Sequence, residues 1–516
     1  MPKKELSHIN HINQIDFKEL DFQNVLSFFE EISKIPRCSK HEEKIASYLE
    51  NFGKEHQFET KRDSSNNVLI KVPASPNCEN QPAVILQAHM DMVCEKEADS
   101  NHDFSKDELK LSYISENGIP YLVADKTTLG ADDGIGVAYA LAIAASKEII
   151  HPPLELLFTT DEEQGLTGAQ EMSDDFISGD HLINLDSEEE GTIIIGCAGG
   201  AQVEFRKIFE AEKLLPSDSL FYTASVSGLL GGHSGTEIHI GRRNANKILT
   251  QFMTIVCEKK DSNLKIINIS GGSAHNAIPR DAECLFSADA SAEELKTAAE
   301  ICAAQIKSEL GFNDTDFQIS VSAIDISNFE SNAVGFSTAA SVQILQFLTV
   351  IPTGVFDISQ ESLNFVSSSG NLATVKTVNS KESGRKEIEI ICSLRSDNES
   401  KLKANIKESE LLAENHSFDF ELSGIYNPWE PDFKSPFVQK CKKIYGDMFQ
   451  KNVQILSIHA GLECSVFRKK YPALPMISIG PDIIGAHTPS EKLNLEAAEK
   501  VWVYLKEILK SFKNEK

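Results

Sequence analysis

The sequence lacks any apolar run that approaches the ~20 residues needed to cross a bilayer. Its first residues, MPKKELSHINHINQIDF, contain two lysines with no apolar segment behind them, so no secretory signal is expected. Positive charge is scarce, because 50 Lys and Arg stand against 77 Asp and Glu and give a net charge of −27. Nucleic acid and anionic membranes would be repelled and are not expected partners.

Cysteine pairs with metal or redox spacing are also missing. The ten cysteines are scattered, with no CxxC motif and no spacing typical of a small disulfide scaffold. In a large chain without a signal peptide, we expect reduced, mostly buried thiols and a cytoplasmic location. The 41% of hydrophobic residues is ordinary for a globular protein, and 516 residues exceed one hydrophobic core, so two or more domains are expected.

The first 200 residues alternate short apolar runs with helical segments. Helical stretches are expected within 24–53, the second beginning at Ser39 and Glu42 as a capping pair, and over 134–147. A strand is expected at NVLIKV (67–72), and buried strands are expected in three segments: AVILQAHMDMV (83–93), LELLFTTDEE (154–163) and HLINLD (181–186). This alternation predicts an α/β domain, in which sites gather at the carboxyl ends of the strands.

From about residue 205 the pattern changes and includes an internal repeat. Residues 264–298 and 362–403 each suggest strand, Ser/Gly-rich turn with an Asn, strand and helix, aligning Asn276 with Asn371. After the turn YNPWEP the α/β pattern resumes. We therefore predict a catalytic domain split into 1–204 and 425–516. Between its parts lies an inserted α+β lid domain, 205–424, with repeat halves of about 205–312 and 313–424.

Acids or histidines follow the apolar runs in five segments: AHMD, LGADDG, TTDEEQG, NLDSEEEG and IGAHTP. Each alone is most often a solvated surface feature. Together they indicate a metal site, because charges directly after buried runs need neutralisation. Histidines and carboxylates without thiolate suit catalytic zinc, with cobalt or manganese as alternatives. The excess of carboxylates suggests two ions that share a bridging Asp.

The motifs also resemble those of the co-catalytic zinc aminoacylase and carboxypeptidase clan, and within it the aminoacyl-histidine dipeptidases of peptidase D type. The resemblance covers nearly the whole chain, in the family's own motif order: HMDMV, LGADDGIGVA, TTDEEQGLTGA, LINLDSEEEG, GCAGG, GGHSGTEIHIGRRNANK, GGSAHNAIPRDA, IHAGLEC and IGAHTPSEKL. It implies a two-zinc enzyme that cleaves dipeptides, including Xaa-His dipeptides such as β-alanyl-histidine.

Carried over by position, the resemblance implies five ligands. One ion would be held by His89, Asp132 and Asp186, and the other by Asp132, Glu163 and His487, with Asp132 bridging. Asp91, two residues after His89 on a strand and so on the same side, would orient that imidazole. Glu162, beside a ligand, would act as general base toward water and then protonate the leaving amine.

Six further residues would contact the substrate or its reacting bond. His233 would stabilise the oxyanion, and Arg395 would grip the terminal carboxylate through its guanidinium fork. The remaining candidates are Asn276 and Asn371 for the peptide backbone, His459 for the side chain or amine, and Glu463 for the ammonium. If the two lid halves are fused, His233 and Arg395 could meet over one active site, and a monomer would be complete. The chain would be a monomer or a homodimer.

Three other functions stay open. The same ligands would serve an N-acyl-amino-acid amidohydrolase or a tripeptide aminopeptidase, although GCAGG and HAGLEC favour the dipeptidase. A metal-binding protein without catalysis is the alternative from another class. Nucleotide binding through GADDGIG is set aside because two acids stand where a phosphate needs bare amides. The segment GGHSG does not present the GxSxG of a serine hydrolase.

Overall fold

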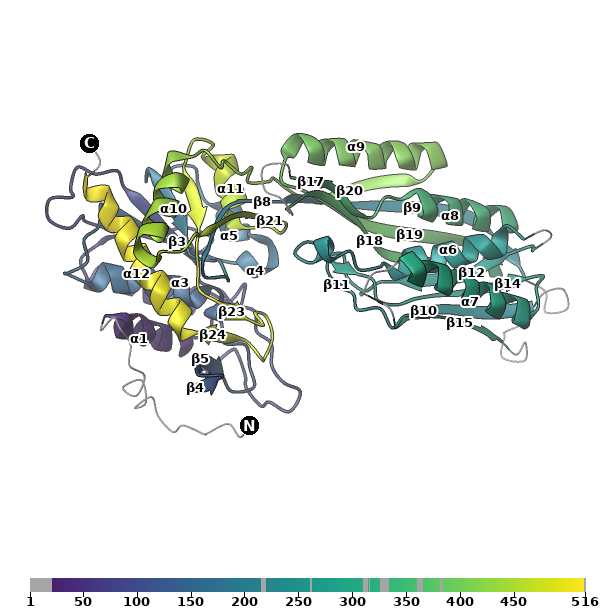
Figure 1. The fold of residues 1–516 in the computed structure, drawn as a ribbon, viewed down its shortest axis with the longest axis horizontal. Coiled ribbons are helices and arrows are strands. Elements are labelled where there is room, and N and C mark those ends of the chain that lie inside the picture. Colours follow the sequence, from purple (N-terminus) through teal and green to yellow (C-terminus); the bar gives the residue numbers. More distant parts are fainter. Residues whose placement is uncertain are drawn as a thin grey trace. The chain divides into compact units, whose positions relative to one another are not determined.

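The computed structural model describes residues 21–214, 220–259, 262–309, 314, 316–324, 334–359, 365–380 and 384–514. They form two compact units. Unit 1 comprises the chain up to Gly196 together with Pro431–Ser457 and Leu462–Lys516, and unit 2 comprises Cys197–Glu430 and Ile458–Gly461. Unit 2 is thus inserted into unit 1, and each unit is coloured by sequence in Figure 1.

Unit 1 contains an eight-stranded mixed sheet in the order β1-β2-β6-β3-β7-β22-β8-β21. Its strands are β1 (Glu59–Arg62), β2 (Val68–Val72), β3 (Val84–His89), β6 (Leu154–Thr159), β7 (His181–Asn184), β8 (Thr192–Cys197), β21 (Gln454–Ile458) and β22 (Met476–Ser478). The four central strands, β6, β3, β7 and β22, run parallel to their neighbours within this group. Every residue of β3 and β6 is buried, as the apolar runs predict.

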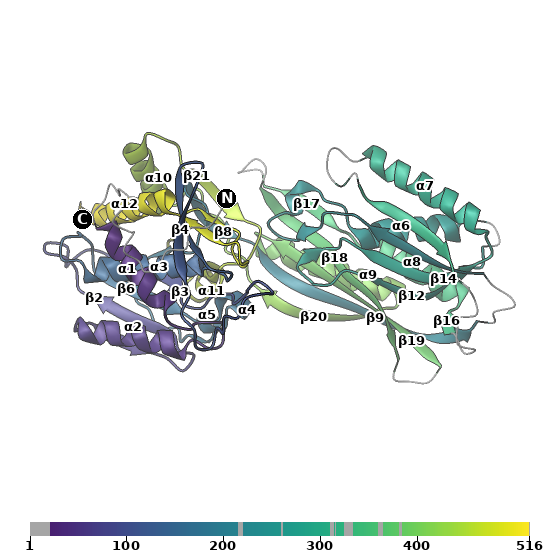
Figure 2. The ribbon, with the colours of Figure 1, turned by 90° about the horizontal axis from the view of Figure 1, so that it is seen from below.

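Helices pack against this sheet (Figures 1 and 2). The helical elements of unit 1 are α1 (Phe22–Ser33), α2 (Glu43–Glu55), α3 (Ala131–Ala145), α4 (Glu162–Gly165), α5 (Thr167–Glu171), α10 (Pro436–Phe449), α11 (Glu463–Lys470), α12 (Leu495–Ser511) and the 3₁₀ turn η4 (Phe512–Asn514). A four-stranded sheet, β23-β24-β5-β4, completes the unit: β4 (Leu111–Glu116), β5 (Ile119–Ala124), β23 (Ile483–Ile484) and β24 (Lys492–Asn494). The described helices include none with the length and hydropathy of a membrane span.

Unit 2 is built on a ten-stranded sheet whose main path is β15-β10-β14-β12-β18-β19-β9-β16. Its strands are β9 (Gly199–Lys213), β10 (Leu220–Ser227), β12 (Lys265–Gly271), β14 (Ala282–Ala288), β15 (Gln318–Ala323), β16 (Val334–Phe336), β17 (Gly354–Ile358), β18 (Val366–Asn379), β19 (Arg385–Ser396) and β20 (Asp419–Tyr426). The helices α6 (Ala245–Cys257), α7 (Ala292–Glu309), α8 (Thr338–Val350) and α9 (Glu399–His416) share one hydrophobic core with it.

The strand pairing of unit 2 has an internal symmetry. β14 lies between β12 and β10, and β10 also pairs β15; likewise β19 lies between β18 and β9, and β9 also pairs β20. The two halves join where β12 pairs β18. We propose that this is the predicted duplication in an interleaved form, because β9 precedes the first half yet belongs to the second. The predicted boundary at residue 204 falls inside β9, and the one at 312/313 lies outside the described residues.

Three local predictions are wrong. The Ser/Gly-rich segment around Asn371 is not a turn but part of the unbroken strand β18, where Gly370 leaves room for the Phe356 ring. Ser39 does not cap α2, because its hydroxyl donates to Asp91 instead. Cys38 is not a free thiol but forms a disulfide with Cys94. The other eight cysteines form no disulfide among the described residues, and all but Cys257 are buried, as expected.

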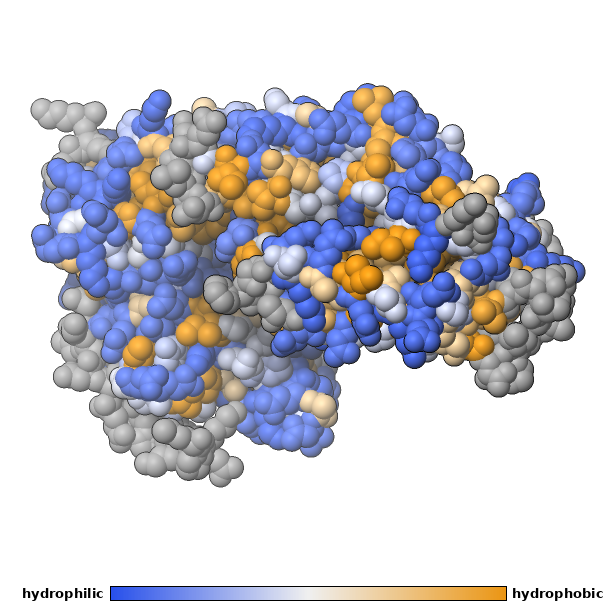
Figure 3. Space-filling view, turned by 45° about the vertical axis from the view of Figure 1, so that its right-hand side comes forward, coloured by the Kyte–Doolittle hydropathy of each residue, from blue (hydrophilic) through white to orange (hydrophobic). Residues whose placement is uncertain are grey.

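In Figure 3, hydrophilic residues separate the apolar ones on the visible face. This distribution agrees with a chain in which a quarter of the residues are charged. Helix α7 begins with a capping box, since the Ser291 hydroxyl accepts from the Glu294 amide and Glu294 accepts from the Ser291 amide.

Candidate functional site

Three parallel strands of unit 1 deliver acids and a histidine to one edge of the sheet. β3 ends on His89, β6 is followed by Glu162 and Glu163, and β7 is followed by Asp186. Because β6 and β7 flank β3 in parallel, their carboxyl ends lie together. The position of these residues directly after buried strands is what brings them to one site.

Asp132 comes from a different element, the beginning of the buried helix α3. Gly130 before it adopts a left-handed conformation, and the peptide bond between Asp132 and Asp133 is cis. The Asp132 side chain is 9% exposed. The carboxylate of Asp133 accepts instead from the backbone amides of His89 and Gly136. It therefore stabilises the backbone around the site and does not belong to the group of candidate ligands.

The five predicted ligands contact one another in two groups. His89 Nε2 lies 2.9 Å from Asp132 Oδ1 and 3.3 Å from Asp186 Oδ1. His487 Nε2 lies 3.2 Å from Asp132 Oδ2 and 2.9 Å from Glu163 Oε2. Each set of three ligand atoms lies within 4.8 Å, which is close enough for one ion. Asp132 belongs to both sets through different oxygens, the arrangement that a bridging carboxylate requires.

The charges of this cluster call for cations. Burial opposes a charge on His89, yet Asp186, Asp132 and Asp91 raise its pKa well above the usual value. Hydrogen bonds to Asp132 and Glu163 raise the pKa of His487 to about 11. Burial raises the pKa of Asp186. The carboxylates of Asp132, Glu163 and Asp186 stabilise positive charge on the two imidazoles. Together these five side chains form an N/O donor set that fits two divalent ions.

Asp91 lies behind His89, as predicted. Its Oδ1 is 3.4 Å from His89 Nδ1, the nitrogen that faces away from the other ligands. It also accepts from the Ser39 hydroxyl at 2.8 Å and from the Glu162 amide at 3.1 Å. Although burial alone would raise the pKa of Asp91, these contacts lower it and keep the carboxylate charged. An ionised, fully buried Asp91 can fix the tautomer and orientation of His89.

Glu162 begins the short helix α4 next to the ligand Glu163. Burial, with the nearby carboxylates Asp186, Glu163 and Glu463, raises its pKa well above the ordinary value, while His89 opposes the rise. A raised pKa brings a carboxyl nearer to the range in which it can accept and return a proton at neutral pH. The environment of Glu162 therefore suits a general base.

Glu463 is fully buried at the beginning of α11. Its Oε2 accepts from the Gln87 amide at 2.6 Å and from the Thr159 hydroxyl at 2.7 Å. Its Oε1 has no hydrogen-bond partner among the described residues. Gln87 is itself held by Asn184, whose amide donates to it at 2.6 Å. Burial raises the pKa of Glu463 to about 7, so a cation placed at Oε1 would stabilise its charged form.

In unit 2, His233 lies in the two-residue strand β11 (Gly232–His233), which pairs β13 (Ala277–Ile278). The Ser234 amide donates to the Asn276 carbonyl at 2.8 Å, so the two predicted residues His233 and Asn276 lie on neighbouring segments. His233 Nδ1 accepts from the Thr236 amide at 3.0 Å. A neutral His233 therefore carries its proton on Nε2, which is the donor that an oxyanion needs.

Gly235 marks where three predicted residues of unit 2 converge. A Cβ at this position would lie 2.4 Å from the His459 carbonyl oxygen, 2.9 Å from His233 Cε1 and 3.2 Å from Arg395 Nε. Only glycine leaves room for this approach. The single chain thus brings His233 of one half close to Arg395 of the other.

Arg395 is 8% exposed and lies near the end of β19. Its Nη1 donates to the Tyr426 hydroxyl at 2.7 Å, while its Nε has no hydrogen-bond partner among the described residues. His459 Nε2 lies 2.6 Å from the Ser369 hydroxyl. Burial, with Arg395 and His233, lowers the pKa of His459 to about 3 and keeps that ring neutral. An arginine with an unsatisfied buried donor suits a carboxylate ligand.

The side chain of Asn371 makes hydrogen bonds within unit 2 through both its amide and its oxygen. Its amide donates to the Ala277 carbonyl at 2.8 Å, and its oxygen accepts from the Asn244 amide at 3.2 Å. It therefore links the two halves of unit 2. Three neighbours of these residues were not expected from the sequence: Tyr426, Ser369 and Gly235. Of these, only Gly235 lies in a motif that the sequence singles out, GGHSG, and a glycine in a loop has many possible structural reasons.

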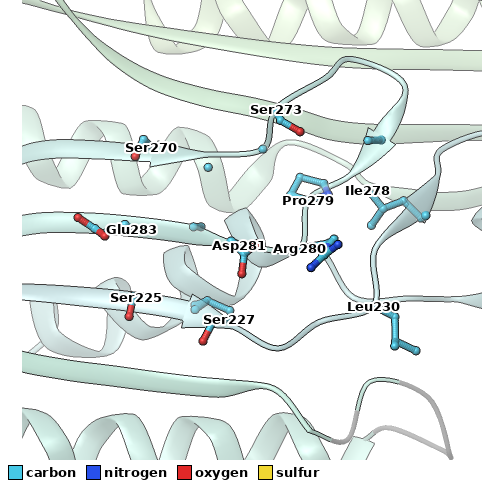
Figure 4. A pocket seen from close by; sticks show the side chains of 16 residues that line it. Ser225, Ser227, Leu230, Ser270, Ser273, Ile278, Pro279, Arg280, Asp281 and Glu283 are labelled. Carbon is cyan, nitrogen blue, oxygen red and sulfur yellow. The ribbon is translucent and has the colours of Figure 1, made fainter. Parts of the chain in front are cut away.

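A pocket of about 830 Å³ lies on the first half of unit 2 (Figure 4). It is lined by Ser225 and Ser227 on β10, by Ser270 on β12, and by Arg280 next to Asp281. Two of its lining residues, Gly232 and Ala277, belong to the strand pair β11 and β13, in which Gly232 is followed by His233. The predicted site residues do not themselves line this pocket.

Comparison with known proteins agrees with these features. The profile of the Peptidase family M20/M25/M40 matches residues 85–511. The cytosol non-specific dipeptidase of Escherichia coli (strain K12) is 36% identical over 497 residues, which cover 96% of this chain and 99% of that protein.

Two solved structures are similar over almost the whole chain. The aminoacylhistidine dipeptidase of Vibrio alginolyticus is 34% identical, with a TM-score of 0.82, 96% of this chain and 97% of that chain covered. The aminopeptidase PepT of Bacillus cereus is 15% identical, with a TM-score of 0.57 and coverage of 95% and 98%, a likeness in fold alone.

Proposed function

Because this chain belongs to the peptidase family M20/M25/M40, we propose that the five-ligand cluster of unit 1 is the centre of a two-metal dipeptidase. The enzyme hydrolyses the peptide bond of dipeptides, Xaa-His dipeptides among them. The observation that carries the proposal is the position of Asp132, each of whose oxygens contacts the histidine of a different ligand set. A location in the cytoplasm is supported by the name of the Escherichia coli relative.

Two divalent ions, zinc in our proposal, would act as Lewis acids toward the scissile carbonyl and toward water. Glu162 accepts the proton of the attacking water and passes it to the leaving amine, as its raised pKa allows. Asp91 holds His89 in the ligand tautomer through Nδ1. His233 donates from Nε2 to the carbonyl oxygen, where negative charge develops.

The ends of the substrate are recognised by opposite charges. Arg395, whose Nε lacks a partner among the described residues, binds the terminal carboxylate, and Tyr426 fixes its guanidinium. Glu463 binds the free ammonium through Oε1. His459, kept neutral by burial, contacts the substrate without adding charge. Asn276 and Asn371 have the weakest support, and Asn371 acts by holding Ala277 in place.

A substrate panel separates this function from its alternatives. We expect two metal ions per chain by elemental analysis, and hydrolysis of β-alanyl-histidine and alanyl-alanine in preference to trialanine and N-acetylalanine. Faster hydrolysis of trialanine or N-acetylalanine would assign the chain to a tripeptidase or an amidohydrolase. Protein that holds both metals and cleaves none of the four would be a metal-binding protein without catalysis.

Two neighbouring substitutions test the assignment of roles. Glu162→Gln should lower kcat by about 10²–10⁴-fold while both metals stay bound. Glu163→Gln should lower metal occupancy as well, because Glu163 contacts His487 in the second ligand set. Glu55→Gln, on the exposed end of α2, is the matched control. Wild-type kcat in Glu162→Gln would refute the proposed base.

The convergence of His233 and Arg395 in one chain supports a monomer with a complete set of substrate-binding residues. Light scattering combined with activity assays over a dilution series tests this. The specific activity should stay constant down to concentrations at which only monomer is detected. A loss of activity on dissociation of a dimer would contradict it.

A further inference from the structure

Arg37 is buried between two loops that carry the candidate metal ligands. It follows α1 in sequence and is 2% exposed. Its Nη1 donates to the carbonyl oxygens of Met90 at 3.2 Å and Asp91 at 2.9 Å, and its Nη2 donates to that of Gly130 at 2.5 Å. One rigid, planar guanidinium therefore connects the segment after β3 with the segment that leads into α3.

The two glycines of LGADDG make room for this side chain. A Cβ on Gly130 or on Gly134 would lie 2.6 Å from Arg37 Nη2, closer than real Cβ atoms come to other atoms. The glycine at 130 is also required by its left-handed conformation, whereas the one at 134 is helical. The absence of a side chain at Gly134 is therefore explained by Arg37 and by the adjacent Phe29 ring.

The surroundings of Arg37 are strongly acidic. Burial lowers the pKa of its guanidinium, and four buried carboxylates oppose that effect: Glu491, Asp91, Asp133 and Asp132. Glu491 in turn accepts from the amides of Leu129, Gly130 and Ala131. A buried cation costs several kcal/mol unless it is paired and hydrogen-bonded, so this arginine is held by both carbonyls and acids.

The residues next to Arg37 strengthen the same connection. The Met92 amide donates to the Arg37 carbonyl at 3.1 Å, and Ser39 donates to Asp91 at 2.8 Å. The disulfide between Cys38 and Cys94 links the two segments covalently. Residues 37–39 therefore lie along residues 90–94 and fix the backbone on which His89 and Asp91 stand.

We propose that Arg37 is a positioning residue for the metal centre. Its guanidinium fixes the separation between the loop bearing His89 and Asp91 and the loop bearing Asp132, and thereby sets the affinity of the ligand cluster for divalent ions. It contacts neither substrate nor reacting atoms. The inference rests on the proposed two-metal site, but its test is metal binding, which can fail independently of peptidase activity.

The test compares Arg37→Gln and Arg37→Lys with Arg62→Gln. Arg62 is a part-buried arginine at the end of β1 that donates to the Asn66 side chain and to no backbone carbonyl of the ligand-bearing loops. Metal-free proteins are titrated with Co²⁺, followed by visible absorption and calorimetry. Arg37→Gln should bind Co²⁺ about 10–100-fold more weakly with an altered absorption spectrum. Arg37→Lys should fall between it and wild type, because one ammonium cannot span both loops. Arg62→Gln should match wild type.

Kinetics and a second substitution distinguish a role in positioning the metal centre from a general loss of structure. At saturating metal, KM for β-alanyl-histidine should stay within about twofold of wild type in Arg37→Lys while kcat falls. Gly134→Ala should weaken Co²⁺ binding in the wild-type background but little in Arg37→Gln, since the shorter side chain no longer meets the new methyl.

Wild-type affinity and spectrum in Arg37→Gln would overturn the proposal. If Arg37→Gln does not fold, wild-type affinity in Arg37→Lys would overturn it instead. Wild-type protein that binds no Co²⁺ or cleaves no dipeptide would refute the proposed function. Two bound ions in wild type with equal binding in the variants would refute only the role of Arg37.

Discussion

The fully buried Glu463 should make unit 1 less stable as the pH rises, and Glu463→Gln should remove that loss. Burial raises its pKa from 4.5 to about 7, with His89 and two hydrogen-bond donors opposing the rise. At 1.36 kcal/mol for each pKa unit, ionising Glu463 in the folded protein costs about 3 kcal/mol. Glutamine keeps an oxygen that can accept from Gln87 and Thr159, and it carries no charge.

The sign follows from proton linkage. The folded state holds the Glu463 proton more tightly than the unfolded state does, so the free energy of unfolding falls between about pH 4.5 and pH 7. Below that window Glu463→Gln should match wild type. Above pH 7 the variant should be more stable by up to about 3 kcal/mol.

Urea unfolding of chelator-treated protein at pH 4.5 and pH 8 measures this difference. The chain has two tryptophans, and in a Trp429→Phe background the buried Trp502 reports on unit 1, where Glu463 lies. Glu55→Gln should change the stability by less than about 0.5 kcal/mol at both pH values. An equal effect of Glu463→Gln at the two pH values, or a loss of stability at pH 8, would refute the reasoning. If Glu463 also binds the ammonium, the stabilised variant should hydrolyse dipeptides poorly.

Three further outcomes are expected. Arg395→Lys should lower kcat/KM for β-alanyl-histidine by about 10–100-fold, because an ammonium loses the bidentate grip, and it should affect the C-terminal amide of the same dipeptide much less. Reducing the disulfide between Cys38 and Cys94, which spans 56 positions, should lower the free energy of unfolding by at most about 4 kcal/mol in urea titrations; ten reactive thiols in denatured, unreduced protein would contradict the pairing. Chelation should abolish peptidase activity, and Zn²⁺, Co²⁺ or Mn²⁺ should restore it; activity that survives complete metal removal would exclude the two-metal mechanism.

The cluster of candidate metal ligands could be predicted because the positions of its residues depend on local sequence. His89 ends one largely buried strand, and Glu163 and Asp186 come shortly after two others. Because the three strands are parallel neighbours, their carboxyl ends lie at one edge of the sheet. Asp132 is harder, since the choice between Asp132 and Asp133 depends on the backbone at the beginning of α3. The resemblance to the family implies the first acid of the pair in LGADDG, and the contacts of Asp132 to both histidines agree with that choice.

Other features could not be predicted because they depend on partners far away in the sequence. Ser39 has the spacing of a helix cap, but the buried Asp91 offers its hydroxyl a charged acceptor, which is a stronger hydrogen bond. The serines of β18 suggest a turn, but its pairing with β19 satisfies their backbone groups in a buried strand. Arg37 carried no signal at all, because its acceptors are backbone carbonyls of Met90, Asp91 and Gly130.

The interleaved pairing of unit 2 gives a physical reason for one chain to hold both His233 and Arg395. β9 supplies the second half with a strand before the first half begins, and β12 then joins β18 edge to edge. The short strands β11 and β13 continue from this junction, so the His233 loop reaches the end of β19 at Gly235. Separate halves would expose the edges of β12 and β18 and would need a second chain to bring these side chains together. Substitutions that weaken the junction, such as Asn371→Ala, should therefore reduce activity together with the stability of unit 2, without changing metal affinity.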